Sequence, residues 1–371
     1  MPEPPLRVAY VVTSTGVGGA ERQVYDLAAV FRSRGWGVGV VSMVPLHDQF
    51  LPLRDEGVRL ASLEMTKGRP DPRGLVRLAR LLRAWRPDVV HGHMSHANLI
   101  TRLVRPLVPG PRYVSTMHNQ DEGHQWRYYA YRLTSPLAHV TTTVSQVAVD
   151  EAVRRHATRR QDMLLVPNGI DTRRHEPDPV LRRSTRAALG LEDRFVWLTA
   201  GRLVEAKRHA DLIAAMRLVR QSIPEVQLLI AGSGALHSML EREIERSDLT
   251  ANVSLLGLRD DVGALMQAAD GFVMSSAWEG LPMVLLEAAA TALPIVSTDV
   301  GGTREVVKER ETGFVVPAEQ PQRLAQEMLR LMALSPEERR AMGQRARQHI
   351  SDAFGLDRIA DRWESVYRPP A

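Results

Sequence analysis

The feature that most constrains the fold is a rhythm of short apolar segments, each followed by an amphipathic stretch, that runs through the chain twice. In the first half, segments of strand length lie at residues 6–14, 37–43, 58–63, 87–93, 112–119, 139–145 and 162–170. In the second half they lie at residues 195–203, 226–234, 253–258, 271–276, 294–302 and 313–317. Strands that alternate with helices are typical of parallel sheets. The sequence therefore predicts an α/β protein with two parallel-sheet domains.

The length agrees with two domains. A chain of 371 residues fits two α/β domains of roughly 150–190 residues each. A segment rich in Arg, Pro and Asp at residues 171–186 separates the two runs of strands. We place the N-terminal domain at residues 1–172 and the C-terminal domain at residues 173–353. The chain ends in a helical, Arg-rich stretch.

Composition excludes several classes of function. The chain has no cysteine, so disulfides, a thiolate nucleophile and a thiolate metal site are excluded. The net charge of +5 suits nucleic acid, anionic lipid or a phosphorylated substrate. The aromatic residues are scattered without a basic-aromatic ladder, so we expect no nucleic-acid partner.

We expect a cytoplasmic protein, soluble or peripheral to a membrane. The N-terminal sequence does not have the pattern of a signal peptide, and no apolar run approaches the ~20 residues needed to span a bilayer. A predicted helix at residues 73–86 carries five arginines between apolar positions. It would suit contact with an anionic membrane, and the alternative is an ordinary helix packed on a sheet.

The first glycine-rich loop, GVGGAE at residues 16–21, separates the first strand from the first helix. Gly16, Gly18 and Gly19 would let the backbone approach a ligand, and the helix N-terminus would offer N–H groups to an anion. The alternatives are a tight turn and a dinucleotide site. A dinucleotide site needs an acid near the end of the second strand, where the sequence VSMVP (41–45) has none.

Two cations follow the first strand of the second half, in GRLVEAK (201–207). Arg202 and Lys207 would lie at the carboxyl end of a parallel strand, where open α/β sheets bind ligands. A guanidinium and an ammonium together suit a diphosphate. Lysine occurs only at Lys67, Lys207 and Lys308, which draws attention to a lysine in a motif. The alternative is two solvated surface cations.

The most specific segment is SSAWEGLPMVLLEA (275–288), a strand end, a loop and an alanine-rich helix. Glu279 lies in the loop, and Glu287 lies in the early turns of the helix. The break at Gly280 and Pro282 allows both acids to face one pocket. The N–H groups of residues 280–284 could hold a phosphate or sugar oxygens.

Three further features stay open at this level. The turn TDVGGTRE (298–305) either lines the same pocket or supports it. His118 ends a first-half strand, where its imidazole would hydrogen-bond a sugar or remain a capped surface side chain. His91, His93 and His96 have a spacing that invites zinc, but they do not share one face and no cysteine is available, so we expect no metal.

Together these segments resemble the family 4 retaining glycosyltransferases, which have the GT-B fold of two Rossmann-like doubly wound domains facing a central cleft. The resemblance runs through nearly the whole chain, in this order: GVGGAERQ, STMHN, TVS, VPNGID, GRLVEAK, LIAGSG, VSLLGLRDD, the two acids Glu279 and Glu287 with seven residues between them, and DVGGTREVV. The order and spacing carry more weight than any single motif.

The resemblance implies roles for individual residues. Arg202 and Lys207 would neutralise the diphosphate of a nucleotide sugar, Glu279 would hold sugar hydroxyls, and Glu287 would hold the ribose. His118 would hydrogen-bond the donor sugar. The catalytic residues would thus be His118, Arg202, Lys207 and Glu279. The remaining contacts to the nucleotide sugar would come from Gly16, Gly18, Gly19, Gly232, Leu258, Gly280, Leu281, Pro282, Met283, Val284 and Glu287.

The resemblance also implies a mechanism and an arrangement of domains. The reaction would retain the anomeric configuration by front-face substitution and would require no metal and no cofactor besides the nucleotide sugar. The N-terminal domain would bind the acceptor. A C-terminal helix at about residues 354–371 would pack back onto it.

The donor and the acceptor are less defined. We expect a UDP-sugar and a glycan or lipid-linked acceptor in polysaccharide or glycolipid biosynthesis, at the inner face of the membrane. The alternatives are a GDP-mannose-dependent mannosyltransferase and a natural-product glycosyltransferase. More remote ones are a non-hydrolysing UDP-sugar epimerase and a non-catalytic sugar-binding scaffold. A glycoside hydrolase would use two carboxylates but no diphosphate clamp.

Overall fold

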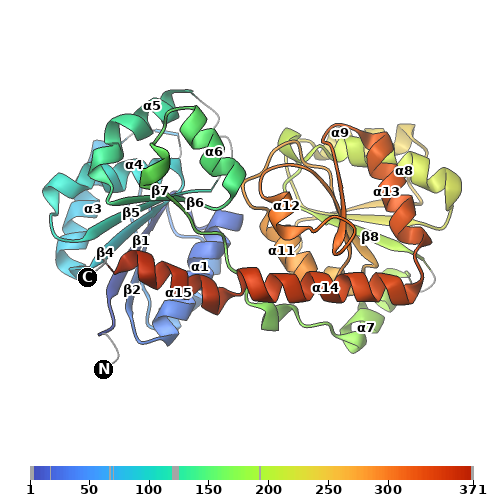
Figure 1. Ribbon diagram of the computed structural model, residues 1–371, viewed down its shortest axis with the longest axis horizontal. Helices are drawn as coiled ribbons and strands as arrows, with labels where there is room; N and C mark the ends of the chain where they lie inside the picture. The colour runs from blue at the N-terminus through green and yellow to red at the C-terminus, as the bar shows by residue number, and fades with distance from the viewer. Residues whose placement is uncertain are drawn as a thin grey trace. The chain divides into compact units, whose positions relative to one another are not determined.

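The computed structural model describes residues 4–16, 18–66, 68–69, 71–118, 125–191 and 194–368 (Figure 1). The chain forms two compact units. Unit 1 is Met1–Ile170 together with Leu356–Ala371, and unit 2 is Asp171–Gly355. Each unit is an α/β body around one parallel sheet, as the rhythm of the sequence predicts.

The described part of unit 1 contains a seven-stranded parallel sheet in the order β3-β2-β1-β4-β5-β6-β7. Its strands are β1 (Arg7–Val12), β2 (Gly37–Ser42), β3 (Arg59–Ser62), β4 (Val89–His93), β5 (Arg112–Met117), β6 (Val140–Thr143) and β7 (Met163–Leu165). In the central strand, Val12 is in register with Ser42 of β2 and with His93 of β4. The strand predicted at residues 162–170 is shorter in the structure, because only residues 163–165 pair with β6.

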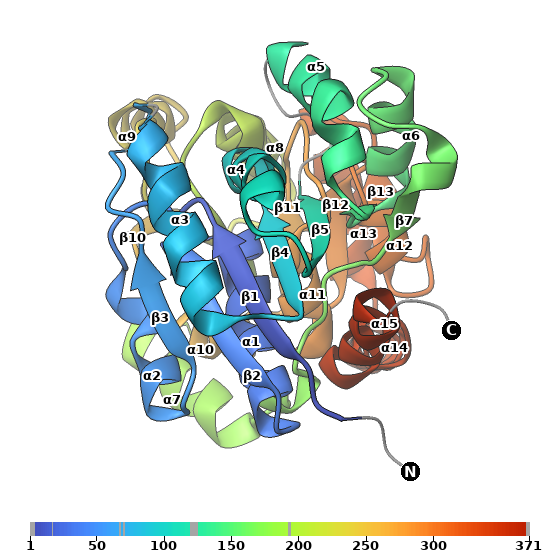
Figure 2. The ribbon, with the colours of Figure 1, turned by 90° about the vertical axis from the view of Figure 1, so that its left-hand side faces the viewer.

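Helices cover both faces of the unit 1 sheet. They are α1 (Gly19–Ser33), α2 (Pro52–Asp55), α3 (Pro72–Trp85), α4 (Ser95–Val104), α5 (Gln125–Thr134), α6 (Gln146–Arg154) and α15 (Leu356–Tyr367). Tyr10 of β1 packs with α1 and α15, whereas its neighbours Ala9 and Val11 pack with α3 and α4. Figure 2 shows α3 and α4 on the near side of this sheet. The strands are apolar on both faces because both faces are covered.

The described part of unit 2 contains a six-stranded parallel sheet in the order β10-β9-β8-β11-β12-β13. Its strands are β8 (Val196–Ala200), β9 (Gln227–Ala231), β10 (Val253–Gly257), β11 (Gly271–Met274), β12 (Ile295–Thr298) and β13 (Gly313–Val316). Its helices are α7 (Pro179–Leu189), α8 (His209–Ser222), α9 (His237–Arg246), α10 (Val262–Ala268), α11 (Met283–Ala290), α12 (Thr303–Val306), α13 (Pro321–Ala333) and α14 (Pro336–Phe354). Helices α8, α9 and α13 share one buried apolar cluster with the sheet.

The passage expected at residues 171–186 contains the start of a helix. Helix α7 begins after Asp178, whose carboxylate accepts hydrogen bonds from the N–H groups of Val180 and Leu181, and Pro179 occupies the first turn. It ends at Gly190, which adopts a left-handed conformation with φ of +64°. These are ordinary start and stop signals for a helix. They were missed because the helix shows no buried apolar face: Arg186 is its one buried residue.

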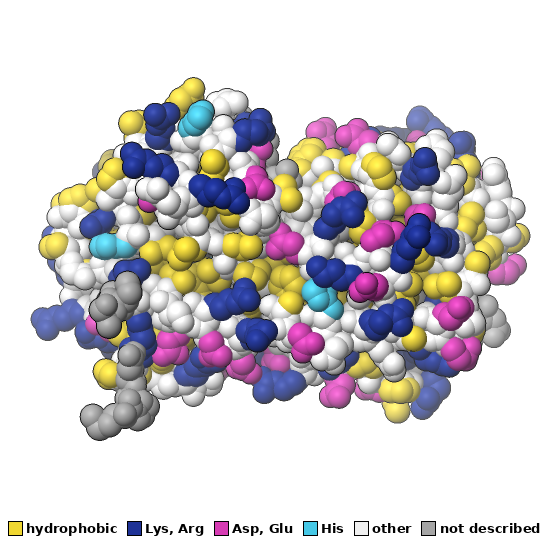
Figure 3. Space-filling view, in the orientation of Figure 1, with side chains coloured by type: hydrophobic (Ala, Val, Ile, Leu, Met, Phe, Trp, Pro, Cys, Tyr) yellow, Lys and Arg dark blue, Asp and Glu magenta, His cyan; other side chains and the backbone are white. Residues whose placement is uncertain are grey.

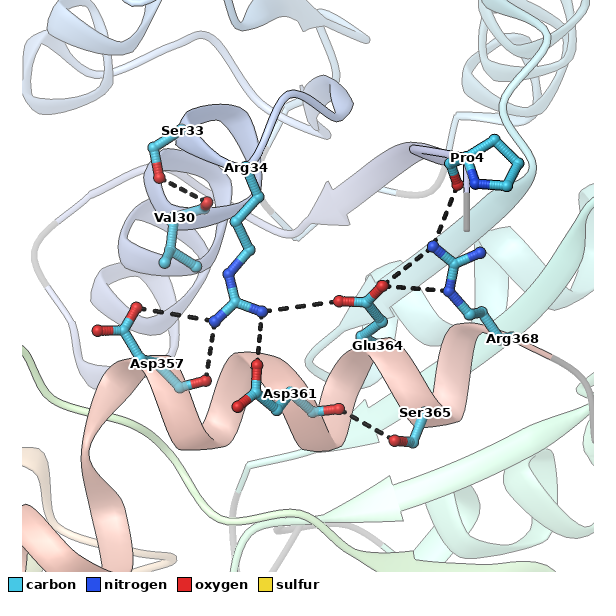
Figure 4. A network of polar contacts seen from close by, with 9 residues as sticks. All are labelled: Pro4, Val30, Ser33, Arg34, Asp357, Asp361, Glu364, Ser365 and Arg368. Atoms are coloured by element: carbon cyan, nitrogen blue, oxygen red, sulfur yellow. Dashed lines mark hydrogen bonds and ion pairs between the residues drawn. The ribbon is translucent and has the colours of Figure 1, made fainter. Parts of the chain in front are cut away.

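Helix α15 belongs to unit 1, although it follows unit 2 in the sequence. It packs along α1, and the guanidinium of Arg34 lies 3.7, 2.7 and 3.6 Å from the carboxylates of Asp357, Asp361 and Glu364 (Figure 4). Arg368 donates to Glu364 and to the carbonyl oxygen of Pro4.

The surface carries mixed charge. On the face that Figure 3 shows, Lys and Arg side chains are scattered over both units among Asp and Glu. Within the described residues, no helix is long and apolar enough to cross a membrane.

Candidate functional site

In unit 2, the order of the strands places a switch point at the carboxyl ends of β8 and β11. These neighbouring strands lead to connections on opposite sides, because β9 and β10 lie beyond β8 whereas β12 and β13 lie beyond β11. Ligands of open α/β sheets bind in the crevice at such a point. The loops after β8 and β11 carry the GRLVEAK and SSAWEGLP segments, so the two most specific motifs of the second half meet here.

Glycines allow the loops after β8 and β9 to pack backbone against backbone. The N–H of Gly201 donates to the carbonyl of Ala231 at 2.9 Å, and the N–H of Gly232 donates to the carbonyl of Gly257 at 2.7 Å. A Cβ atom on Gly232 would lie 1.8 Å from the carbonyl oxygen of Gly201. A side chain at position 232 is therefore incompatible with this approach. Leu258, which follows β10, is 67% exposed.

Lys207 and Glu279 form an ion pair across the switch point. The Nζ of Lys207 donates to Oε1 of Glu279, and the same oxygen accepts from the hydroxyl of Ser276 at 2.7 Å. Both side chains keep part of their surface exposed, 20% for Lys207 and 14% for Glu279. The loops are joined further by the N–H of Ala277 and the carbonyl of Ala206 at 2.8 Å. The structure thus brings together two residues that are 72 positions apart.

Arg202 is a free cation on the same loop. Its side chain is exposed, and the described part of the chain gives it no hydrogen-bond or ion-pair partner. The neighbouring Arg208 is different, because it pairs with Asp211 at 2.9 Å and with Glu319 at 3.3 Å. Arg202 is therefore available to an anion, whereas Arg208 is engaged with carboxylates.

The turn at residues 279–282 leads into α11 and is supported by the DVGGTRE segment. The N–H of Gly302 donates to the carbonyl of Gly280 at 2.7 Å, and the hydroxyl of Thr298 donates to the carbonyl of Ser276 at 2.7 Å. Gly301 has φ of +52°, and a Cβ there would lie 2.4 Å from the carbonyl oxygens of both Glu279 and Gly280. These contacts show that the segment at residues 298–305 supports the turn.

Helix α11 presents an uncapped N-terminus at the end of this turn. Its N-cap residue, Pro282, has no side chain that accepts from the first turn. The backbone from Gly280 to Val284, with the buried Leu281 and Met283, is therefore a suitable place for an anion or for sugar oxygens. Glu287 lies farther along α11 and is half-buried.

In unit 1, the glycine loop carries an acid at the start of α1. Gly18 is the N-cap, and Glu21 in the first turn accepts a hydrogen bond from the hydroxyl of Ser14 at 2.8 Å. A Cβ on Gly18 would lie 2.4 Å from Oε2 of Glu21, whereas Gly16 faces open space. The carboxylate of Glu21 stabilises the helix N-terminus that we expected to attract an anion. Gly19 is the first residue of α1.

His118 follows β5 and is buried, with 8% of its surface exposed. Its Nε2 lies 2.8 Å from Nδ1 of His93, at the end of the neighbouring strand β4. His118 is thus part of a buried pair, not a surface side chain. Burial lowers the pKa of His118 to about 4, so its imidazole is neutral at pH 7.

Of the three histidines that suggested zinc, His91 and His93 have neighbouring rings with centroids 3.9 Å apart, and His96 lies on another element. His91 and His93 lie buried on β4, whereas His96 is exposed on α4. Nδ1 of His91 lies 2.7 Å from the hydroxyl of Tyr367, and its Nε2 lies 2.6 Å from Oγ1 of Thr116. Both ring nitrogens of His91 therefore bind within the protein. Within the described residues, no group of three potential ligands converges on a metal position.

Two contacts at these sites were not predicted. Ser276 binds Glu279, and the only signal for it is the spacing of three residues within SSAWEG. His93 binds His118, and no local pattern indicates it, because the two residues meet only through strand pairing. A hollow of about 730 Å³ in unit 1, lined among others by Arg132, His139 and Arg159, contains no predicted site residue.

Comparisons with known proteins agree with these motifs. The model of "Glycosyl transferases group 1" matches residues 182–349, and the model of "Glycosyltransferase Family 4" matches residues 17–174. The UDP-Gal:alpha-D-GlcNAc-diphosphoundecaprenol alpha-1,3-galactosyltransferase of Escherichia coli is 24% identical over 80% of this chain and 79% of its own.

A second relative and a solved structure extend the likeness. The GDP-mannose-dependent monoacylated alpha-(1-6)-phosphatidylinositol monomannoside mannosyltransferase of Corynebacterium glutamicum is 32% identical over 54% of this chain and 55% of its own. The crystal structure of Anabaena HepE in complex with UDP-glucose superposes with a TM-score of 0.85 at 20% identity, covering 97% of this chain and 99% of that chain. The two family models together span both units, and the chain therefore belongs to the group 1 glycosyltransferases, family-4-like enzymes with the GT-B fold.

Proposed function

We propose that this glycosyltransferase is retaining and moves a sugar from a UDP-sugar to a hydroxyl of a glycan or lipid-linked acceptor. The observation that carries the proposal is the cation arrangement at the switch point of unit 2. Lys207 is held against Glu279, and the guanidinium of Arg202 lies free on the same loop. Such a pair of cations is suited to the diphosphate of a nucleotide sugar.

Each candidate residue has a role in this proposal. Arg202 and Lys207 stabilise the negative charge that develops on the leaving diphosphate. Glu279, whose orientation is fixed by Lys207 and Ser276, binds sugar hydroxyls, and Glu287 binds the ribose. His118 hydrogen-bonds the transferred sugar.

The backbone completes the proposed donor site. The N–H groups of residues 280–284 at the start of α11 contact the sugar and the phosphates, and the exposed segment at Leu258 contacts the base. Gly232 keeps the loop after β9 close to Gly201. The loop of Gly16, Gly18 and Gly19 lies at the reacting end, and unit 1 binds the acceptor.

The proposed chemistry is front-face substitution. The bond between the anomeric carbon and the donor phosphate oxygen breaks, and its electron pair stays with that oxygen. The acceptor oxygen bonds to the same face of the anomeric carbon, and its proton passes to the departing phosphate. Retention of configuration follows, and no protein nucleophile is required. An anomeric-proton NMR spectrum of the product tests it, because an inverted product excludes this mechanism.

Three similar proteins support two different donors. HepE is in complex with UDP-glucose, and the E. coli relative is named for UDP-Gal and a diphosphoundecaprenol acceptor, which favours UDP and a lipid-linked acceptor. The C. glutamicum relative is GDP-mannose-dependent, so a mannosyltransferase is the second candidate. A lipid-linked acceptor would place the enzyme at the inner face of the membrane.

The first experiment is calorimetry with UDP, GDP and ADP, with and without Mg²⁺, on the wild type, Lys207→Ala and Lys308→Ala. Lys308 is an exposed lysine of the same unit, and among the described residues its ammonium binds only the carbonyl of Arg304, at 3.4 Å, so it is a matched control. We expect one nucleotide to bind, about tenfold more weakly in Lys207→Ala and unchanged in Lys308→Ala. If none of the three nucleotides binds, the proposed donor is excluded.

A second assay separates the rivals of the same fold. An epimerase would convert the bound UDP-sugar to its epimer without an acceptor, and a scaffold would leave it intact even with a suitable acceptor. Transfer of sugar from the donor to an added acceptor contradicts both.

A further inference from the structure

The pair of buried histidines in unit 1 contains two ring nitrogens without partners among the residues that the structure describes. Nδ1 of His93 and Nε2 of His118 bind each other edge to edge at 2.8 Å, with ring centroids 5.1 Å apart and ring planes at 29° to each other. Nε2 of His93 and Nδ1 of His118 are buried, and no described residue binds them. Buried polar atoms in folded proteins nearly always have a partner, so an unpaired one at a candidate site points to a missing ligand.

The neighbouring His91 shows what a fully satisfied imidazole in this network is like. The hydroxyl of Tyr367 donates to the hydroxyl of Tyr10 at 3.2 Å, so its oxygen must accept from His91. His91 therefore carries its proton on Nδ1, and its Nε2 accepts from the hydroxyl of Thr116. Its tautomer is fixed on both sides.

The tautomers of His93 and His118 are not fixed in this way. Burial, followed by the nearby imidazoles of His91 and His118, holds the pKa of His93 well below its ordinary value, and burial lowers that of His118 to about 4. Both rings are neutral at pH 7, so one of them donates to the other.

Two arrangements of protons are then equivalent in number of hydrogen bonds. If His93 donates, Nδ1 of His118 carries a proton and can donate to a ligand. If His118 donates, its Nδ1 is bare and can accept from a ligand. In either case the bond to His93 occupies Nε2 of His118, and Nδ1 remains the atom for the ligand.

We infer that His93 is a positioning residue of the sugar site, which holds Nε2 of His118 so that Nδ1 of His118 faces the ligand as either donor or acceptor. The ligand that matches is an uncharged hydroxyl, because a hydroxyl can donate or accept and the pair brings no charge. The inference rests on the proposed function, in which His118 hydrogen-bonds the transferred sugar.

The experiment compares His93→Leu, His93→Asn and Tyr367→Phe. Leucine removes the bond to His118. Asparagine keeps an amide near the position of Nδ1, with both a donor and an acceptor. Tyr367→Phe is the matched control, because it removes a buried hydroxyl from the adjacent network without touching the pair. The readouts are the Kd of UDP and the KM and kcat with UDP-glucose or UDP-galactose, whichever supports transfer.

We expect His93→Leu to raise the KM for the UDP-sugar about tenfold and to leave the Kd of UDP within about twofold, since UDP lacks the sugar. His93→Asn should recover the KM to within about threefold, and Tyr367→Phe should match the wild type. An unchanged KM in His93→Leu would overturn the inference. So would a parallel loss of UDP affinity, or a failure of asparagine to rescue.

A spectroscopic measurement on the wild type does not depend on the folding of a variant. In protein labelled with ¹⁵N-histidine, we expect the ring nitrogens of both His93 and His118 to shift when the UDP-sugar is added, but not with UDP alone. A shift confined to His118, or no shift, contradicts the coupling. If the wild type binds none of the nucleotides, the proposed function fails at that step, before His93 is tested.

Discussion

At the scale of single residues, four buried histidines make the fold sensitive to acid. Burial lowers the pKa of His118 and His209 to about 4, in His209 with a further contribution from Lys207, and it holds the pKa of His91 and His93 well below the ordinary value of 6.5. Between about pH 4 and 6.5 the unfolded chain therefore binds more protons than the folded one. Stability is complete above about pH 6.5 and is lost as the pH falls.

We predict that each of these histidines removes about 1 kcal/mol of stability between pH 7 and pH 5.5. Urea unfolding at the two pH values measures the loss. His209→Asn should reduce the loss of unfolding free energy by about 1 kcal/mol, the contribution of one histidine. Equal losses in the wild type and in His209→Asn would show that His209 is not protonated on unfolding.

At the scale of elements, the turn before α11 depends on Gly301. Alanine there would force a Cβ to within 2.4 Å of two carbonyl oxygens at a φ of +52°. We predict a destabilisation of about 3 kcal/mol and weaker nucleotide binding, because the turn positions Glu279.

Gly263→Ala is the matched control, since Gly263 lies in α10 with nothing within 4 Å of the added Cβ. It should be neutral or stabilising by up to about 1 kcal/mol. Thermal unfolding and calorimetry together measure both effects, and a tolerated Gly301→Ala would contradict the role of the turn.

The elements were predictable where the signal was local. The strands of both sheets could be located from their apolar segments, and Arg202, Lys207 and Glu279 could be chosen because each follows a strand. Helix α7 was overlooked because it buries no apolar residue, and its clearest signals, Asp178 and Gly190, stand at its ends. The support of Glu279 by Ser276 and the pairing of His93 with His118 depend on how a loop folds and which strands are neighbours. Neither can be read from spacing alone.

At the scale of the whole molecule, the chain passes between the units twice, at residues 170–171 and 355–356. The two passages are joined inside unit 1, where the N–H of Leu356 donates to the carbonyl of Ile170 at 2.9 Å. A Cβ on Gly169 would lie 3.0 Å from the side chain of Ile359, so α15 lies directly against the end of the first passage. The sequence rhythm indicates two sheets, but this closure requires the fold.

Helix α15 supplies part of the core of unit 1, and this leads to a prediction about how the units unfold. The side chain of Trp363 is buried, with 2% of its surface exposed. Its ring centroid lies 4.6 Å from that of His91 and 5.6 Å from that of Tyr367. We predict that Trp363→Ala destabilises unit 1 by about 3–5 kcal/mol, because it leaves a cavity between α15 and the sheet. Arg34→Ala should cost at most about 1 kcal/mol, because Asp357 and Asp361, with which Arg34 pairs, are largely exposed.

Hydrogen exchange followed by mass spectrometry locates the effect. In Trp363→Ala, peptides of β1, β4 and α1 should lose protection, while peptides of β8, β11 and α11 should keep it, and calorimetry should still detect the nucleotide. The reason is that α15 is the last element of the chain but belongs to the core of unit 1, so its loss removes packing only there. Equal loss of protection in both units would mean that the units unfold as one cooperative body, and that α15 stabilises unit 2 as well.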